Sequence, residues 1–138
     1  MFDAVHRNAS LLAIAFLFVH IGTSLLDGFA PIRLIDVAIP FGSAYRPLRL
    51  GFGAVAFDLL IAVALTSVFR RRLGYRGWRA THWLAYASWP VAVLHGLGAG
   101  SDTKTIWMLG LTGACVIAVV VAVFARAADA GRSTWGRG

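Results

Sequence analysis

Four histidines are the residues of this sequence whose type and spacing point most directly to chemistry. They are the only histidines in the 138 residues, and they form two couples, His6 with His20 and His82 with His95. Each couple frames an apolar stretch, where an ionisable side chain is unfavourable unless it has a partner or a ligand. At about 1.5 Å per residue, the members of a couple lie about 20 Å apart along a helix. One zinc or copper ion gathers its ligands far more closely, so the histidines indicate two separate levels.

Four apolar segments are long enough to place these histidines inside a membrane. The chain is 59% hydrophobic and 14% charged, with a mean hydropathy of +0.74, which is typical of an integral membrane protein. Crossing about 30 Å of hydrocarbon takes about 20 apolar residues in a helix. The sequence predicts an all-α, integral membrane four-helix bundle over residues 1–126, followed by a mobile cytoplasmic tail over 127–138. The expected helices are about 9–26, 51–69, 80–97 and 106–125.

The distribution of basic residues predicts the orientation. Nine of the thirteen lie before the first helix, between the second and third helices, or in the tail, and four lie in the other connections. Because basic connections stay inside, both termini are expected in the cytoplasm, and the net charge of +7 does not indicate a nucleic-acid partner. The connection 27–50 contains three prolines and is expected on the membrane surface or folded over the bundle. Residues 101–103 are expected to cap the fourth helix.

The direction of the helices predicts how the histidines pair. The first and third helices run the same way, so His6 and His82 share an inner level, and His20 and His95 share an outer level. Two imidazoles from different helices are what a haem iron needs for axial ligation on both faces. Fourteen steps return a helix to within about 40° of its starting face, whereas thirteen leave His82 and His95 about 140° apart. A kink at Pro90 is therefore needed to turn both rings inward.

The histidine pattern resembles the ferric reductase-like transmembrane domain family. That superfamily includes NADPH oxidases, ferric reductases and the haem subunit of the bacterial methionine sulfoxide reductase system. The likeness covers about residues 4–125 and is carried by the four histidines and by HWLAYASWPVAVLHG, residues 82–96. It implies two b-type haems, with iron bound by His6 and His82 and by His20 and His95. The implied activity is transfer of single electrons across the membrane.

The departures from the family pattern suggest a minimal version. Family members usually have about six helices, and many add a cytoplasmic FAD and NADPH module, but here four helices and no G-x-G-x-x-G context are expected. The resemblance therefore implies a small cytochrome b of the bacterial inner membrane, an oxidoreductase component and not a complete enzyme. Its expected partners are the lipid bilayer, a separate flavoprotein or quinol as electron donor, and an acceptor on the outer side.

Several other residues have two readings from the sequence. Arginines near the two levels either bind haem propionates or only set the topology; they are Arg7 and Arg79 on the inner side and Arg33 and Arg46 on the outer side. Asp58, within the second helix, either relays protons or is a neutral hydrogen-bonded residue. Gly22, Gly96 and Gly98 allow close approach of a macrocycle or of another helix.

Two further functions stay open at this point. One is a single-haem, quinone-linked membrane anchor that uses His20 and one partner, because His6 lies at the very edge of the first helix. The other is a non-redox membrane interaction protein whose histidines are structural, since a lone membrane histidine is often only a helix contact.

Overall fold

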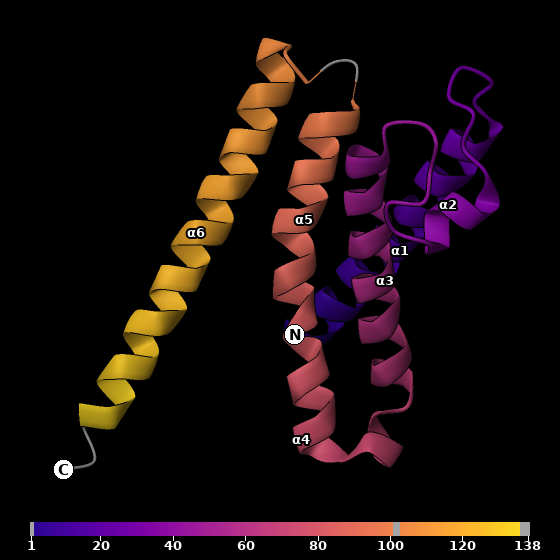
Figure 1. Cartoon of the computed structure of the whole chain (residues 1–138). Coiled ribbons are helices and arrows are strands. Elements are labelled where there is room, and N and C mark those ends of the chain that lie inside the picture. The colour runs from indigo at the N-terminus through magenta and orange to yellow at the C-terminus, as the bar shows by residue number, and fades with distance from the viewer. Residues whose placement is uncertain (1, 101–102, 136–138) are drawn as a thin grey trace. The chain divides into compact units, whose positions relative to one another are not determined.

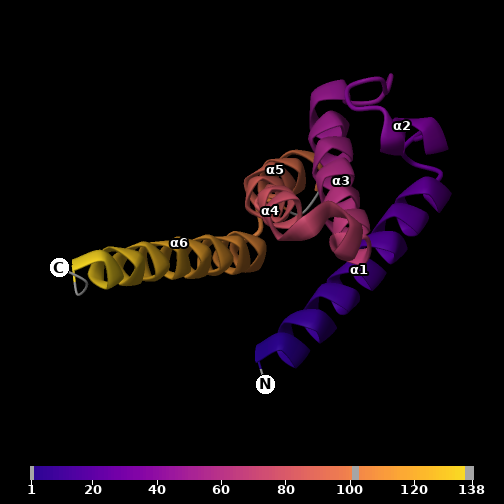
Figure 2. The ribbon, with the colours of Figure 1, turned by 90° about the horizontal axis from the view of Figure 1, so that it is seen from below.

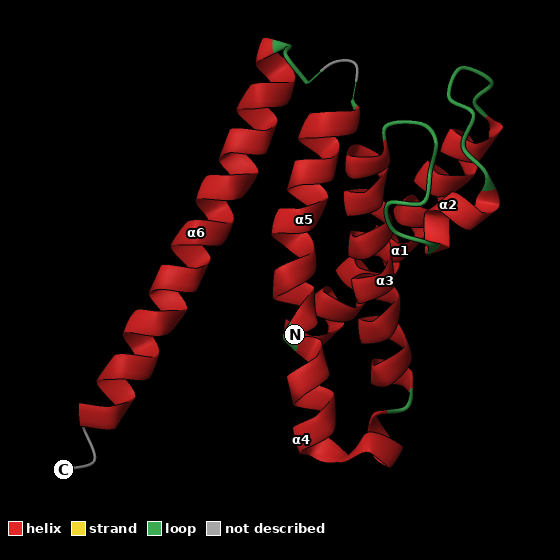
Figure 3. Ribbon diagram, in the orientation of Figure 1, coloured by secondary structure: helices red, strands yellow, loops and turns green. Residues whose placement is uncertain are grey.

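Helices make up nearly all of the described chain. The computed structural model describes residues 2–100 and 103–135, so Ser101 and Asp102, two of the expected helix-capping residues, lie outside it. No strand occurs in those ranges, which confirms the predicted all-α class (Figure 3). The helices are α1 (Phe2–Leu26), α2 (Leu34–Ala38), α3 (Pro47–Val68), α4 (Arg70–His82), α5 (Leu84–Ala99) and α6 (Ile106–Trp135) (Figure 1).

Three of these helices are long and apolar enough to cross a membrane. Their apolar parts are Ala4–Leu26, Pro47–Val68 and Ile106–Ala125, close to three of the four predicted segments. The predicted segment 80–97 is divided, because α4 ends at His82 and the 16-residue α5 begins at Leu84. The chain is therefore a membrane protein with three candidate spans in its described part.

The chain divides into two compact units. The first runs from Met1 to Ala99 and contains all four histidines, and the second runs from Gly100 to Gly138. In the second unit, α6 continues past the apolar stretch that ends at Ala125 and reaches Trp135. The candidate functional residues therefore belong to the first unit.

Within the first unit, α3 is the helix against which α2, α4 and α5 pack. It runs beside α4 and α5, and α2 lies against it as well (Figure 1). Its buried positions are the small residues Gly51, Ala54 and Ala56, and the buried residue of α5 is Ser88. Small side chains let helices approach closely in a membrane, where packing and not water exclusion drives association.

The helix α1 is arranged differently. In the view of Figure 2, α4 and α5 are seen nearly along their axes, whereas α1 lies across the view and is therefore inclined to them. It ends at Leu26 because the chain turns at Asp27, whose Oδ1 accepts a hydrogen bond from the Phe29 backbone N–H at 3.1 Å. Large side chains such as Phe16 stay exposed along it, as suits a helix surrounded by lipid.

Local residues explain where the helices begin and bend. Arg46 adopts a left-handed conformation (φ 43°) and Pro47 occupies the first turn of α3, where its missing N–H costs nothing. Gly74 interrupts α4 with φ 71°, a conformation that glycine adopts readily. Further along, Trp83 separates α4 from α5, and Pro90 lies inside α5.

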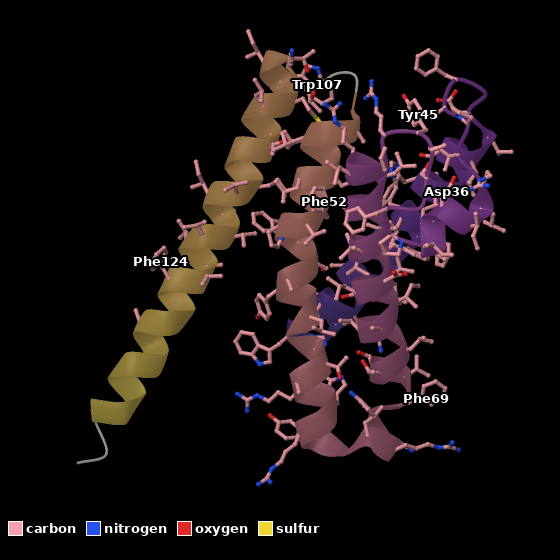
Figure 4. All side chains as sticks on the ribbon, viewed as in Figure 1. Asp36, Tyr45, Phe52, Phe69, Trp107 and Phe124 are labelled. Carbon is pink, nitrogen blue, oxygen red and sulfur yellow. The ribbon has the colours of Figure 1, made fainter. Side chains whose placement is uncertain are left out.

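The connection between α1 and α3 folds back on α3. Asp36, labelled in Figure 4, belongs to α2 and is only 4% exposed. Its carboxylate accepts hydrogen bonds from the backbone N–H of Arg33 at 3.0 Å and from the Arg33 guanidinium at 3.1 Å. The Phe41 ring meets the Phe52 ring of α3 edge to face at 6.0 Å and covers Gly51. The connection thus packs against the beginning of α3.

We expect Asp36→Asn to loosen this connection. The hydrogen bonds from Arg33 lower the pKa of the Asp36 carboxyl, so the stabilisation is fully present above the unfolded pKa of about 3.9. It is lost as the pH falls through the lower folded pKa. Hydrogen exchange of the amides in residues 33–46 should therefore speed up in acid, and in Asp36→Asn already at neutral pH. Asp27→Asn, which removes a charge but keeps the oxygen that accepts the Phe29 N–H, is the control. Equal protection in Asp36→Asn and the unaltered chain would contradict this role.

Candidate functional site

The first histidine pair joins α1 to α4. It consists of His6 and of His82, the last residue of α4, and their ring centroids lie 6.1 Å apart with the ring planes 72° from parallel. The His82 ring lies 5.1 Å from the ring of Trp78. Trp78 in turn donates a hydrogen bond from Nε1 to the Ser67 hydroxyl of α3, at 3.4 Å. The position of His82 is thus tied to α3 through Trp78.

The second histidine pair joins α1 to α5. It consists of His20 and His95, whose ring centroids lie 6.2 Å apart with the planes 76° from parallel. The geometry of the two pairs is therefore nearly the same. Since each pair takes one ring from α1 and one from the α4–α5 segment, the structure brings together the same partners that the helix directions predict.

The segment between His82 and His95 stays close to helical. Both rings approach α1, although an ideal helix would turn them about 140° apart. Trp83, between α4 and α5, keeps right-handed helical dihedrals (φ −63°, ψ −21°), and its backbone nitrogen lies 3.3 Å from the carbonyl oxygen of Arg79. Pro90, the residue at which the sequence predicts a kink, lies within α5 and lacks the N–H that would continue the helical hydrogen bonds.

A hydrogen bond fixes the tautomer of His95. Its Nδ1 lies 2.7 Å from the carbonyl oxygen of Arg49 in α3. A carbonyl oxygen only accepts, so Nδ1 carries the proton in this bond. In the neutral ring Nε2 then keeps its lone pair, and that is the atom through which such a histidine binds a metal.

The His95 ring also lies against Gly53 of α3. A Cβ atom built on Gly53 would be 2.7 Å from Cε1 and from Nδ1 of the ring, far inside van der Waals contact. Gly98 is close to another part of α3, because a Cβ there would lie 3.1 Å from Cγ of Arg49. At Gly22 and Gly96 a Cβ would meet nothing within 4 Å.

The corresponding nitrogen of His82 has different surroundings. Among the described residues, His82 Nδ1 is buried and has no hydrogen-bond partner. A buried polar atom without a partner is unusual in proteins and costs free energy. The two pairs are therefore alike in ring spacing but differ in what holds the ring of the α4–α5 segment.

The ring spacing fits one haem iron in each pair. An iron–imidazole bond is about 2.0 Å, and C–N bonds of about 1.3 Å put the ring centre about 1.2 Å from its nitrogen. Two rings on opposite sides of one iron therefore have centroids about 6.4 Å apart. The observed 6.1 and 6.2 Å are close to this value. No group of three or more His, Cys, Asp or Glu side chains suited to a metal ion occurs in the described part of the chain.

The four arginines singled out in the sequence lie apart from one another. Arg33 forms an ion pair with Asp36 at 3.1 Å, and the guanidinium carbon of Arg46 lies 5.5 Å from the centre of the Tyr45 ring. Arg7 and Arg79 are exposed on α1 and α4. Arg33 is thus used within the connection, although its side chain is still 69% exposed.

Asp58 is exposed on α3, within an apolar candidate span. A carboxyl group in such a position is costly and is usually retained for a function or a partner. The carboxyl group of Asp58 has no hydrogen-bond partner within the described residues, so the bonded reading from the sequence has no support there and the proton-relay reading stays a prediction.

The comparison with protein families identifies the class of this helical membrane protein. Residues 1–93 match the family described as "Ferric reductase like transmembrane component". This is well over half of the chain, so the chain belongs to that family, as its histidine pattern suggests. The matched region includes His6, His20 and His82 and ends two residues before His95. No curated protein matches, and no solved structure matches.

Three features of the site were not identified from the sequence. They are the Arg49 carbonyl, the close approach at Gly53 and the contact of Trp78 with His82. The contact of Trp78 with His82 could have been predicted, since Trp78 lies four residues before His82 and one helical turn brings such residues together. The close approach at Gly53 was harder to predict, because glycine in an apolar helix also marks ordinary packing.

We expect Trp78→Ala to weaken the first pair selectively. An aromatic contact is worth about 0.5–1.5 kcal/mol, so a haem held by the first pair would leave it between about twofold and tenfold faster. Transfer of haem to an excess of apomyoglobin measures this rate. The second pair and a Trp83→Ala control, whose ring faces Tyr86 at 5.0 Å, should be unaffected. Equal acceleration in both variants would show that Trp78 has no specific role.

Proposed function

We propose that this protein is a transmembrane b-type cytochrome that moves single electrons across the membrane through two bis-histidine haems. The first pair, His6 and His82, and the second pair, His20 and His95, would each hold one haem. The observation that carries the proposal is the spacing of the rings, 6.1 and 6.2 Å, in two pairs at different heights on α1. Membership of the ferric reductase-like family supports the same reading.

The residues of the chain bind, orient and shield the cofactors in this proposal. Haem supplies a one-electron iron couple when it is bound. The histidines fix its position, and the hydrogen bond from His95 to the Arg49 carbonyl orients one of them. The spacing of His6 and His20 along α1 separates the levels by about 21 Å, which covers most of a hydrocarbon core of about 30 Å. Exposed arginines such as Arg7 and Arg46 are available to the haem propionates.

The proposed topology has four membrane crossings. The α4–α5 segment would be the third crossing. The last turn of α4 directly precedes α5 in the chain and would lengthen that helix. The nine basic residues at the start of α1, in α4 and after Ala125 would lie in the cytoplasm, and the four others would lie outside. We place the protein in the bacterial inner membrane, with both termini in the cytoplasm.

The proposed role is that of a membrane subunit in a ferric reductase-like redox system. Electrons would enter from a separate flavoprotein or from a quinol and would leave to an acceptor on the outer side. The first pair lies on the side of the arginine-rich helix α4, and the second on the side of the connection 27–46. With the topology above, the first pair faces the donor and the second faces the acceptor.

Haem content of histidine variants tests this function. The purified protein should contain two haems per chain, and His82→Ala and His95→Ala should each retain about half, because each removes one ligand of one haem. The pyridine haemochrome assay gives the content, and Cys115→Ser on α6 is a control that should retain both. One haem in the unaltered chain would favour the single-haem anchor, and no haem would favour the non-redox interaction protein.

The angles between the rings predict a spectroscopic signature. Axial imidazole planes near perpendicular leave two iron orbitals close in energy, which makes the ferric low-spin EPR signal highly anisotropic. With the planes at 72° and 76°, both haems should show a strongly shifted lowest-field line. An ordinary rhombic spectrum, typical of nearly parallel imidazole planes, would contradict the ring geometry at both levels.

A further inference from the structure

A notch on α3 receives the ring of His95. Its two parts are the carbonyl oxygen of Arg49 and the bare backbone of Gly53. Carbonyl groups of an α-helix point toward the residue four places further along, so a side chain at position 53 would stand beside the Arg49 oxygen. A Cβ at Gly53 would occupy the space of the ring, at 2.7 Å from Nδ1. Glycine at this position therefore lets the imidazole reach the carbonyl.

The bond made in the notch changes the ring as a metal ligand. At 2.7 Å the Nδ1···O distance is at the short end of the range for N–H···O hydrogen bonds. A carbonyl that accepts the Nδ1 proton makes the ring richer in electrons and a more basic ligand at Nε2. Ferric iron gains more from such a ligand than ferrous iron does, so the reduction potential falls.

The first pair has no matching arrangement. His82 Nδ1 is buried without a hydrogen-bond partner in the described part of the chain, and the neighbouring ring of Trp78 lies against the face of the imidazole. The two pairs have almost the same ring spacing, 6.1 and 6.2 Å. The hydrogen bond at Nδ1 is therefore the clearest chemical difference between the two levels.

We propose that the Arg49 carbonyl, made accessible by Gly53, positions His95 and lowers the reduction potential of the iron bound there. The two haem sites would then differ in reduction potential, because only one of them has this hydrogen bond to an axial histidine. The inference rests on the proposed function, because it requires haem at the second pair. Arg49 and Gly53 are positioning residues, since both act through His95.

Potentiometric titration of Gly53→Ala is the first test. The added methyl group pushes the ring away from the Arg49 carbonyl, so one of the two midpoint potentials should rise while the other stays unchanged. Gly113→Ala is the matched control, because it adds the same methyl group to an apolar helix of the other unit, where a Cβ meets nothing within 4 Å. Two unchanged potentials, or an equal shift of both, would overturn the proposal.

Ligand replacement is a second test for the case that Gly53→Ala loses a haem. His95→Gly is reconstituted with imidazole or with 1-methylimidazole, which has similar basicity but no N–H to donate once it binds iron. Imidazole should give the lower potential or the tighter binding, and His82→Gly should show no such difference between the two ligands. The same result for both ligands at His95→Gly would overturn the proposal.

A third measurement separates this inference from the proposed function. Nitrogen-15 NMR of the full-length chain in lipid nanodiscs, without haem, reports which ring nitrogen carries the proton. His95 should be in the Nδ1–H form in the unaltered chain and should lose this preference in Gly53→Ala. If the chain binds no haem but His95 shows this tautomer, the proposed function fails while the notch stands. An Nε2–H form of His95 would contradict the notch itself.

Discussion

The structure depends on a fixed distance between imidazole rings that belong to different helices. At two heights, a ring from α1 stands about 6 Å from a ring of the α4–α5 segment. Nothing in ordinary helix packing requires the same separation twice, whereas one iron with two axial imidazoles requires it at each level. Under the proposed function, the relation of α1 to its neighbours would follow from a flat haem and its two histidine ligands.

The remaining parts of the first unit keep the rings of the α4–α5 segment in place. α3 packs against that segment and buries glycine and alanine, whose small side chains let helix backbones lie close together. From this position α3 reaches both histidines, His95 directly through the Arg49 carbonyl and His82 through Ser67 and Trp78. The connection 27–46, held by Asp36 and Phe41, covers the beginning of α3.

The sequence predicted the parts of this arrangement that depend on spacing and direction. A spacing of thirteen or fourteen positions between histidines, on helices that run the same way, is enough to predict which imidazoles meet. Apolar length is enough to predict α1, α3 and the apolar part of α6. The family match over residues 1–93 agrees with the histidine pattern on which the resemblance was based.

The parts that the sequence did not predict depend on the backbone and on tertiary contacts. The arginine-rich part of α4 has the composition of a polar connection, so a helix over residues 70–79 was not expected. Nothing in the sequence marks the Arg49 carbonyl as a hydrogen-bond acceptor for a histidine, because every residue has a backbone carbonyl group. The need for glycine at position 53 is evident only from the tertiary structure, in which the ring of His95 lies against it. Asp36 looked like one more charge in a loop, and its burial depends on how that loop folds.

Iron K-edge X-ray absorption of the purified, haem-loaded protein tests the central claim most directly. The account predicts that every iron carries two imidazole rings besides its porphyrin, because both pairs have the same ring spacing. Multiple scattering from the outer ring atoms counts these rings. Iron with a single imidazole, or with oxygen or sulfur as an axial ligand, would contradict the claim that paired histidines of α1 and the α4–α5 segment enclose the metal.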